Sequence, residues 1–121
     1  MRVLIVDDDA AMREALCDTL ELQGHRTAMV ANGREALEHL EHSDLPCLIL
    51  LDLMMPLMNG WEFREAQLKD PLIAAIPVVV ISAHADPLRN ADKLAAAGYL
   101  IKPVDPGRLL QAVAEWCRPA L

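Results

Sequence analysis

Five short runs of apolar residues are spread along the chain, and they differ in how polar they are. Residues 2–6, 47–51 and 77–81 are apolar almost throughout, which is typical of strands buried on both faces of a sheet. The run over residues 26–31 is more polar and the run over residues 99–101 is short, as expected at the edges of a sheet. The pattern therefore predicts three central strands and two edge strands.

Between these runs, apolar residues recur at intervals of three and four, the period of a helix with one buried face. Met12, Leu16 and Leu20 follow this spacing in a predicted helix over residues 10–23, with Asp9 as its cap. The other predicted helices are about ten residues after the cap Asn32, residues 61–69, residues 86–97, and the residues that follow Asp105 and Pro106.

Strand and helix thus alternate five times, which predicts an α/β fold with a doubly wound, five-stranded parallel sheet and five helices on both faces. If the apolar strands are central and the crossovers right-handed, the strand order is 2-1-3-4-5, as in flavodoxin-like folds. The 121 residues contain no repeat, low-complexity run or linker, so we expect one domain over residues 1–121 and no output domain in this chain.

Composition narrows the classes of partner. The formal net charge of −7 argues against direct binding to nucleic acid, which normally requires a basic surface. No segment reaches the length of a membrane span and no signal peptide is recognisable, so we expect a cytoplasmic location and no membrane attachment. The three cysteines, Cys17, Cys47 and Cys117, lie in apolar surroundings without metal-ligand spacing, which predicts reduced core thiols.

Polar residues follow the predicted strands at the points where these leave the sheet, namely Asp7, Asp8, Asp52, Ser82 and Lys102. Because the carboxyl ends of parallel strands meet at one edge, we expect these groups to gather there. Crowded carboxylates repel one another, and Mg²⁺ is the kind of hard cation that relieves the repulsion. A carboxylate, a divalent cation, a lysine and a hydroxyl together are what phosphoryl transfer onto an aspartate requires.

Four motifs, each after its own strand, occupy residues 6–8, 52–60, 80–83 and 99–103. In this order they resemble the receiver domain of bacterial two-component response regulators, the CheY-like family, over essentially the whole chain. Within the second motif, Pro56 and the pair Asn59-Gly60 predict an ordered turn before the next helix.

The resemblance implies that Asp52 accepts a phosphoryl group from a phosphohistidine on a sensor histidine kinase or a histidine phosphotransfer protein. It implies that Asp7, Asp8, Asp52 and the backbone carbonyl of Met54 hold Mg²⁺, while Lys102 contacts the phosphoryl oxygens. Such a domain is a phosphoacceptor in signalling, and it catalyses only its own phosphorylation and dephosphorylation.

The resemblance also implies a switch in which Ser82 moves toward the phosphoryl group and Tyr99 turns inward. This movement would alter the face formed by the helix over residues 86–97, the fifth strand and the last helix. Receivers commonly meet a downstream protein or form a phosphorylation-dependent homodimer through this face. A cis peptide bond is expected before Pro103.

Two other functions fit parts of the pattern. A phosphatase of the haloacid-dehalogenase type also uses an aspartyl phosphate, Mg²⁺, a hydroxyl and a lysine, but its motif after the first strand is incomplete over residues 7–11 and no cap segment is present. A receiver-shaped interaction module that works without phosphorylation usually lacks an acidic residue or the lysine, and this chain keeps them all.

Overall fold

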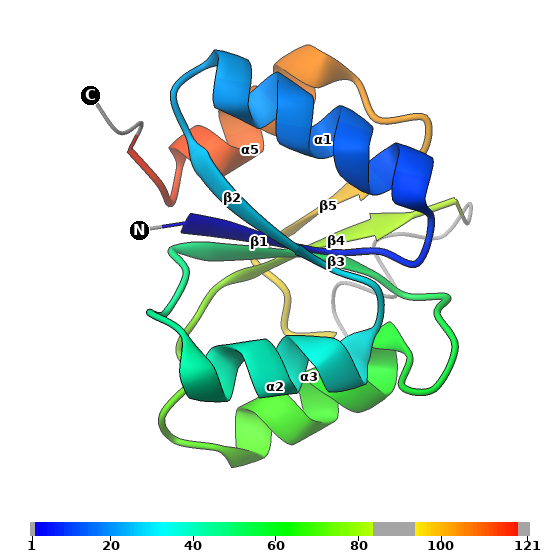
Figure 1. The fold of residues 1–121 in the computed structure, drawn as a ribbon, viewed down its shortest axis with the longest axis vertical. Coiled ribbons are helices and arrows are strands. Elements are labelled where there is room, and N and C mark those ends of the chain that lie inside the picture. The colour runs from blue at the N-terminus through cyan, green and yellow to red at the C-terminus, as the bar shows by residue number, and fades with distance from the viewer. Residues whose placement is uncertain (1, 84–93, 119–121) are drawn as a thin grey trace.

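The structure is a computed structural model that describes residues 2–83 and 94–118 (Figure 1). The strands are β1 (Arg2–Val6), β2 (Arg26–Val30), β3 (Leu48–Asp52), β4 (Val78–Ser82) and β5 (Gly98–Ile101). The helices that lie within the described residues are α1 (Ala10–Leu22), α2 (Gly33–His42), α3 (Gly60–Lys69) and α5 (Pro106–Ala114).

The five strands form one sheet in the order β2-β1-β3-β4-β5, and all neighbouring pairs are parallel. Helices α1 and α5 cover one face of the sheet, while α2 and α3 cover the other (Figure 1). The predicted doubly wound fold and its strand order are therefore confirmed. As predicted, the polar strand β2 and the short strand β5 lie at the two edges.

The fourth predicted helix, over residues 86–97, falls mostly outside the described residues. Its predicted end at about Ala97 is wrong, because Leu94 is the last helical residue. Ala95 already has a left-handed φ of 52°, and the Ala97 N–H donates a hydrogen bond to the Val78 carbonyl at 2.8 Å. The chain thus turns toward β4 before it reaches Gly98.

Among the described residues, no helix is long and apolar enough to cross a bilayer.

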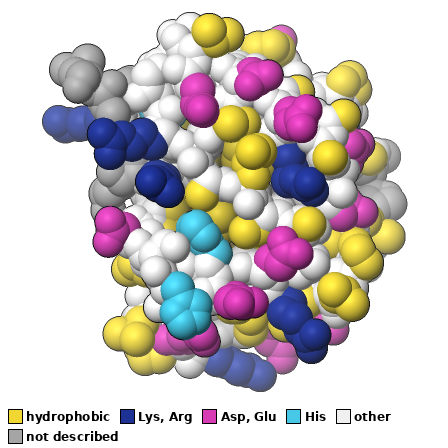
Figure 2. Space-filling model, viewed as in Figure 1, with side chains coloured by type: hydrophobic (Ala, Val, Ile, Leu, Met, Phe, Trp, Pro, Cys, Tyr) yellow, Lys and Arg dark blue, Asp and Glu magenta, His cyan; other side chains and the backbone are white. Residues whose placement is uncertain are grey.

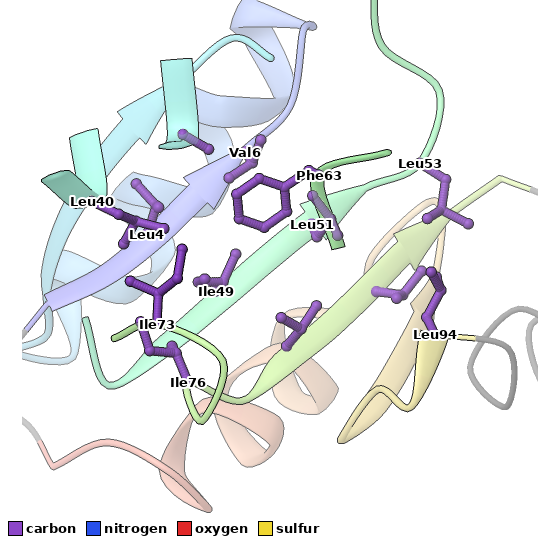
Figure 3. Packing of buried hydrophobic residues seen from close by; sticks show 13 residues of the cluster. Leu4, Val6, Leu40, Ile49, Leu51, Leu53, Phe63, Ile73, Ile76 and Leu94 are labelled. Carbon is purple, nitrogen blue, oxygen red and sulfur yellow. The ribbon is translucent and has the colours of Figure 1, made fainter. Parts of the chain in front are cut away.

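Two layers of aliphatic side chains hold the sheet between its helices. On the α2–α3 face, Phe63 of α3 is fully buried over Val6 and Leu51 (Figure 3). Burying a side chain of this size stabilises the fold by about 1.5–3 kcal/mol. The opposite layer combines strand residues with two helices, through Leu16, Leu20, Leu109 and Val113.

The cysteines correct the prediction of three reduced thiols. Cys47 and Cys117 form a disulfide with their Cα atoms 5.6 Å apart, and Cys17 is the free cysteine. The two bonded residues are 70 positions apart in the sequence, so only the folded chain brings the start of β3 beside the segment after α5. Spacing along the sequence carries no sign of this pairing.

A buried polar network joins α3 to the segment that leads into β5. Arg64 is 5% exposed, and its Nε and Nη2 donate hydrogen bonds to the carbonyls of Leu94 and Ala95 at 2.8 and 3.0 Å. Its Nη1 donates to Oε1 of the fully buried Gln67 at 2.7 Å. Burial lowers the pKa of Arg64. The sequence pattern placed no polar residue in this layer, so this network is a finding of the structure alone.

The loop after β3 approaches the strand end very closely. Asn59 caps α3 and forms a capping box with Glu62, and the Gly60 N–H donates to the Leu53 carbonyl at 3.0 Å. A Cβ placed on Gly60 would lie 2.6 Å from the Asp52 carbonyl oxygen and 2.8 Å from the Leu53 Cα. Both neighbours are backbone atoms, so only glycine fits at this position without moving the strand end.

We therefore predict that Gly60→Ala lowers the free energy of unfolding by about 1–3 kcal/mol, as overpacking does. Gly98→Ala is the matched control, because its Cβ would meet nothing nearer than Val79 Cγ2 at 3.9 Å. Urea unfolding of both variants measures the difference. Equal stabilities for the two variants would contradict the close approach.

Candidate functional site

The predicted site residues stand at the carboxyl ends of four strands. Asp7 directly follows β1, Asp52 is the last residue of β3, Ser82 is the last residue of β4, and Lys102 directly follows β5. The apolar residues of each strand are buried in the sheet, so the first polar residue after them lies at the carboxyl edge of the sheet. In Figure 1 this edge lies opposite the start of β1.

Three carboxylates converge at this edge. Asp7 and Asp52 are buried, with exposed fractions of 1% and 5%, whereas Asp8 is exposed. One oxygen from each of the three lies within 4.8 Å of the others. The prediction that these residues gather is confirmed in space, and the burial of two of them makes their repulsion strong.

Lys102 partly compensates these charges. Its Nζ lies 3.2 Å from Asp7 Oδ2 and 3.5 Å from Asp52 Oδ1, with 21% of the side chain exposed. Burial alone would lower the pKa of Lys102, but the neighbouring charges of Asp52 and Asp7 outweigh it and the pKa is raised. Lys102 therefore keeps its positive charge at neutral pH. The peptide bond between Lys102 and Pro103 is cis, as predicted.

Asp52 is harder to ionise than an ordinary aspartate. Its pKa is raised, chiefly by burial and then by the negative charge of Asp7, while the charge of Lys102 opposes the shift. A backbone hydrogen bond from Met54 also favours the ionised form. One lysine does not balance this group of carboxylates, so additional positive charge would stabilise the ionised site.

Asp7 is held in place by groups that the sequence pattern did not identify. Its Oδ1 accepts a hydrogen bond from the Asp9 N–H at 2.9 Å, and its backbone carbonyl accepts one from Arg13 Nη1 at 2.7 Å. Asp9 at the same time caps α1, as predicted. Arg13 lies on the first turn of α1, one position after the apolar Met12, and its role could not be read from that spacing.

These residues fit a divalent cation. Asp7 Oδ2 is buried and has no hydrogen-bond partner, although Lys102 lies within ion-pair distance. An acidic group of oxygen ligands with one such unsatisfied oxygen and one exposed carboxylate, Asp8, is the donor set that Mg²⁺ prefers. The backbone carbonyl of Met54 as a further ligand stays a prediction.

Ser82 and Tyr99 are related through the sheet. Tyr99 pairs with Val80 in register, and Ser82 stands two residues beyond Val80, so Ser82 and Tyr99 belong to the same face. Ser82 is buried, and Tyr99 is half-buried against the core layer that includes Leu94. Asp52 of β3 pairs with Ile81 of β4, so Ser82 lies one residue closer to the carboxyl end of the sheet than the partner of Asp52.

A contact between the start of α2 and the loop before α3 fixes the position of that loop. The Gly33 N–H donates to the Met58 carbonyl at 2.9 Å, and a Cβ on Gly33 would lie within 2.9 Å of both Met58 and Phe63. Leu57 has a left-handed φ of 66°, which turns the chain between Asp52 and α3. The sequence pattern predicted this turn from Pro56, Asn59 and Gly60. The close contact of Gly33 and the left-handed backbone of Leu57 were not predicted.

With this geometry established, comparison with known proteins identifies the family. The family model described as "Response regulator receiver domain" matches residues 3–114. The chain belongs to the response regulator receiver domain family. PilH of Pseudomonas aeruginosa is 32% identical over 117 residues, which cover 93% of each chain.

Two further matches differ in how much of the matched protein this chain covers. The DNA-binding response regulator MtrA of Mycobacterium tuberculosis is 35% identical over 114 residues, covering 93% of this chain and 48% of MtrA. Among solved structures, the chemotaxis response regulator CheY4 of Vibrio cholerae is 29% identical with a TM-score of 0.86, covering 96% of this chain and 98% of that one. The chain thus spans nearly all of some relatives and about half of others.

Family membership confirms the predicted CheY-like receiver fold and the predicted function in phosphoacceptor signalling. The receiver is a signalling domain, and neither the phosphatase reading nor the phosphorylation-independent module is favoured. The acidic residues and the lysine that the family motifs predicted are brought together in the structure.

The raised pKa of Asp52 predicts a pH-dependent stability difference. In the pH range between the unfolded-state pKa of Asp52 and its raised folded-state value, the folded protein binds more protons, so ionisation destabilises the fold as the pH rises. Asp52→Asn is therefore expected to increase the free energy of unfolding at pH 7, within the usual range of about 0.5–3 kcal/mol for one substitution. The gain should disappear below the ordinary aspartate pKa of about 3.9.

Urea unfolding of wild type and Asp52→Asn between pH 3 and pH 7 measures this difference. Asp44→Asn is the control, since Asp44 is exposed in the loop before β3 and should show no comparable gain. A variant that is less stable than wild type at pH 7 would contradict the predicted repulsion.

Proposed function

We propose that Asp52 is the phosphoacceptor, and that it receives its phosphoryl group from a phosphohistidine of a sensor histidine kinase or a histidine phosphotransfer protein. The observation that carries this proposal is the buried Asp52 carboxylate, with Lys102 Nζ 3.5 Å from Oδ1 and the Asp7 carboxylate beside it. A nucleophile with a cation in reach is the arrangement that aspartyl phosphorylation needs.

In the proposed step, an ionised Asp52 oxygen attacks the phosphorus atom of the phosphohistidine. The bond between phosphorus and the imidazole nitrogen breaks, the electron pair stays on that nitrogen, and an acyl phosphate forms on Asp52. Lys102 is mobile enough on its four-carbon side chain to follow a phosphoryl oxygen, and its charge offsets the negative charge that arrives. The fixed positions of Asp7 and Asp52 hold the attacking group in line.

Mg²⁺ would be held by the carboxylates of Asp7, Asp8 and Asp52 and by the backbone carbonyl of Met54. When bound, it supplies positive charge that neutralises phosphoryl oxygens. Asp7 contributes a buried oxygen without a hydrogen-bond partner, and Asp8 contributes a carboxylate that is open to solvent. Hydrolysis of the acyl phosphate at the same residues would return the domain to its resting state.

The output of the domain is proposed to run through Ser82 and Tyr99. Their common face of the sheet and the half-buried position of Tyr99 support a coupled movement of the two side chains. The movement would reshape the surface formed by β5, α5 and the helix predicted over residues 86–97. A downstream protein or a second phosphorylated copy is the proposed partner of this surface.

The partner is proposed to be a protein in the cytoplasm rather than a nucleic acid or a membrane. The net charge of −7 supports this proposal. On the face seen in Figure 2, basic side chains gather at the upper left, while acidic side chains are spread over the rest of the face.

The proposed cation site predicts a stabilising effect of Mg²⁺. A cation that binds only the folded state raises the melting temperature, with about 2.7 kcal/mol of stabilisation at a hundredfold excess over its dissociation constant. Asp8→Asn should weaken this response at little cost to folding, because Asp8 is exposed. Thermal unfolding in a MgCl₂ titration is the measurement, with Asp44→Asn as the control. A melting temperature that does not change with MgCl₂ would exclude the site.

The phosphoacceptor assignment is tested with Mg²⁺ and the small phosphodonor acetyl phosphate. Intact-mass spectrometry should show one added phosphoryl group on wild type and on Asp44→Asn, and none on Asp52→Asn. Lys102→Ala should slow the labelling by about 10²–10³-fold, the usual effect of removing one electrostatic contact from a transition state. Equal labelling of Asp52→Asn and wild type would refute the assignment.

A further inference from the structure

The disulfide between Cys47 and Cys117 lies apart from the acidic site. Cys47 directly precedes β3, at the amino end of the strand that carries Asp52 at its carboxyl end. Cys117 follows α5, and its bond to Cys47 places both cysteines at that end of the sheet, opposite the acidic residues. The disulfide therefore takes no part in the phosphoryl chemistry proposed at the carboxyl ends of the strands.

Helix α5 is short and depends on tertiary contacts. It has nine residues, of which Leu109 and Val113 are the buried ones. A helix of this length is not stable by itself and needs tertiary contacts to hold it. Cys117 is buried in the same core layer as Leu109 and Val113, so its bond to Cys47 fastens the end of α5 to the central strand β3.

The two sulfur atoms differ in their access to solvent. Cys117 is 5% exposed, whereas Cys47 is only half-buried and its Sγ lies 3.4 Å from the Arg2 carbonyl near the surface. Cys47 is therefore the more exposed residue of the pair, and its sulfur is the one that we expect a small thiol to attack. In a reducing compartment such as the proposed cytoplasm, protein disulfides are usually transient and redox-sensing rather than permanent.

We propose that Cys47 and Cys117 form a reversible thiol-redox site, which fastens α5 to the sheet when oxidised and loosens it when reduced by a low-molecular-weight thiol of the glutathione class. In the reductive direction, a glutathione thiolate attacks Cys47 Sγ and the disulfide breaks. The electron pair leaves on Cys117 Sγ, which takes up a proton. A second glutathione thiolate then attacks the glutathione sulfur bound to Cys47, which releases the Cys47 thiol and glutathione disulfide.

The third cysteine provides an internal control. Cys17 Sγ lies 3.0 Å from Thr27 Oγ1 and 3.4 Å from Glu21 Oε2, on α1. Burial raises the pKa of Cys17, which disfavours its reactive thiolate form. Cys17 should therefore neither exchange with the disulfide nor affect α5.

The redox site has a consequence for signalling that rests on the proposed function. Helix α5 belongs to the surface proposed to respond to phosphorylation of Asp52. An oxidised pair would hold one border of that surface in place, so redox state would set how easily the surface rearranges. The redox site itself needs no phosphorylation, and the two proposals can fail separately.

The test equilibrates the purified chain in glutathione buffers from fully reducing to fully oxidising. Acid quenching, then unfolding and alkylation of the free thiols, followed by mass spectrometry, should find one free cysteine under oxidising conditions and three under reducing conditions. Hydrogen exchange of the α5 amides should become at least about tenfold faster on reduction, as expected when a local restraint is lost. The melting temperature should fall by roughly 10 °C, the effect typical of losing a disulfide in a domain of this size.

Matched variants separate the redox effect from general damage. Cys17→Ser should respond to the buffers as wild type does, while Cys47→Ser should resemble reduced wild type in every buffer. Three alkylated cysteines in all buffers, a pair that no glutathione buffer reduces, or α5 exchange that ignores redox state would each overturn the proposal. Acetyl phosphate labelling of both redox forms is recorded in parallel, because loss of labelling with an intact redox response would refute only the role of Asp52.

Discussion

The structure depends on one electrostatic constraint, which is the burial of two like charges beside a single lysine. Strands β1 and β3 are neighbours, so the carboxylates of Asp7 and Asp52 emerge side by side at the edge of the sheet. Lys102 follows β5, which is separated from β3 by β4, and only a long side chain brings its charge back to both carboxylates. Burial, and then the negative charge of Asp7, raise the pKa of Asp52, and a further cation would stabilise its ionised form.

The rest of the fold keeps these groups from moving apart. Apolar side chains bury β1, β3 and β4 almost completely, so the strand ends cannot slide. Gly60 lets the loop after β3 lie against the Asp52 carbonyl, and Gly33 lets the start of α2 donate a hydrogen bond to the Met58 carbonyl. The buried carboxylates lower the stability of the fold, and the two apolar core layers raise it. This division is common where a site must hold unfavourable charges in position.

Away from the acidic edge, two further connections decide which segments are fixed. The buried guanidinium of Arg64 binds the carbonyls of Leu94 and Ala95 and so anchors the chain just before the strand that carries Tyr99. The Cys47–Cys117 disulfide anchors the end of α5. Both connections border the surface proposed to change on phosphorylation, so covalent and buried polar contacts bound the segments proposed to move.

The sequence by itself determined the alternation of strands and helices, the caps Asp9, Asn32 and Asp105, and the set of polar residues at the strand ends. These follow from local physics: the period of apolar residues, the needs of helix termini, and the rule that parallel strands end at one edge. Only the tertiary structure decided the roles of Arg13, Gly33 and Arg64 and the pairing of the cysteines. The bond from Arg13 to the Asp7 carbonyl spans six residues and depends on how the chain passes from β1 into α1, which the helical spacing does not describe. The contacts of Gly33 and Arg64 and the cysteine pairing join segments far apart in the sequence, and no local spacing encodes which groups will meet when the chain is folded.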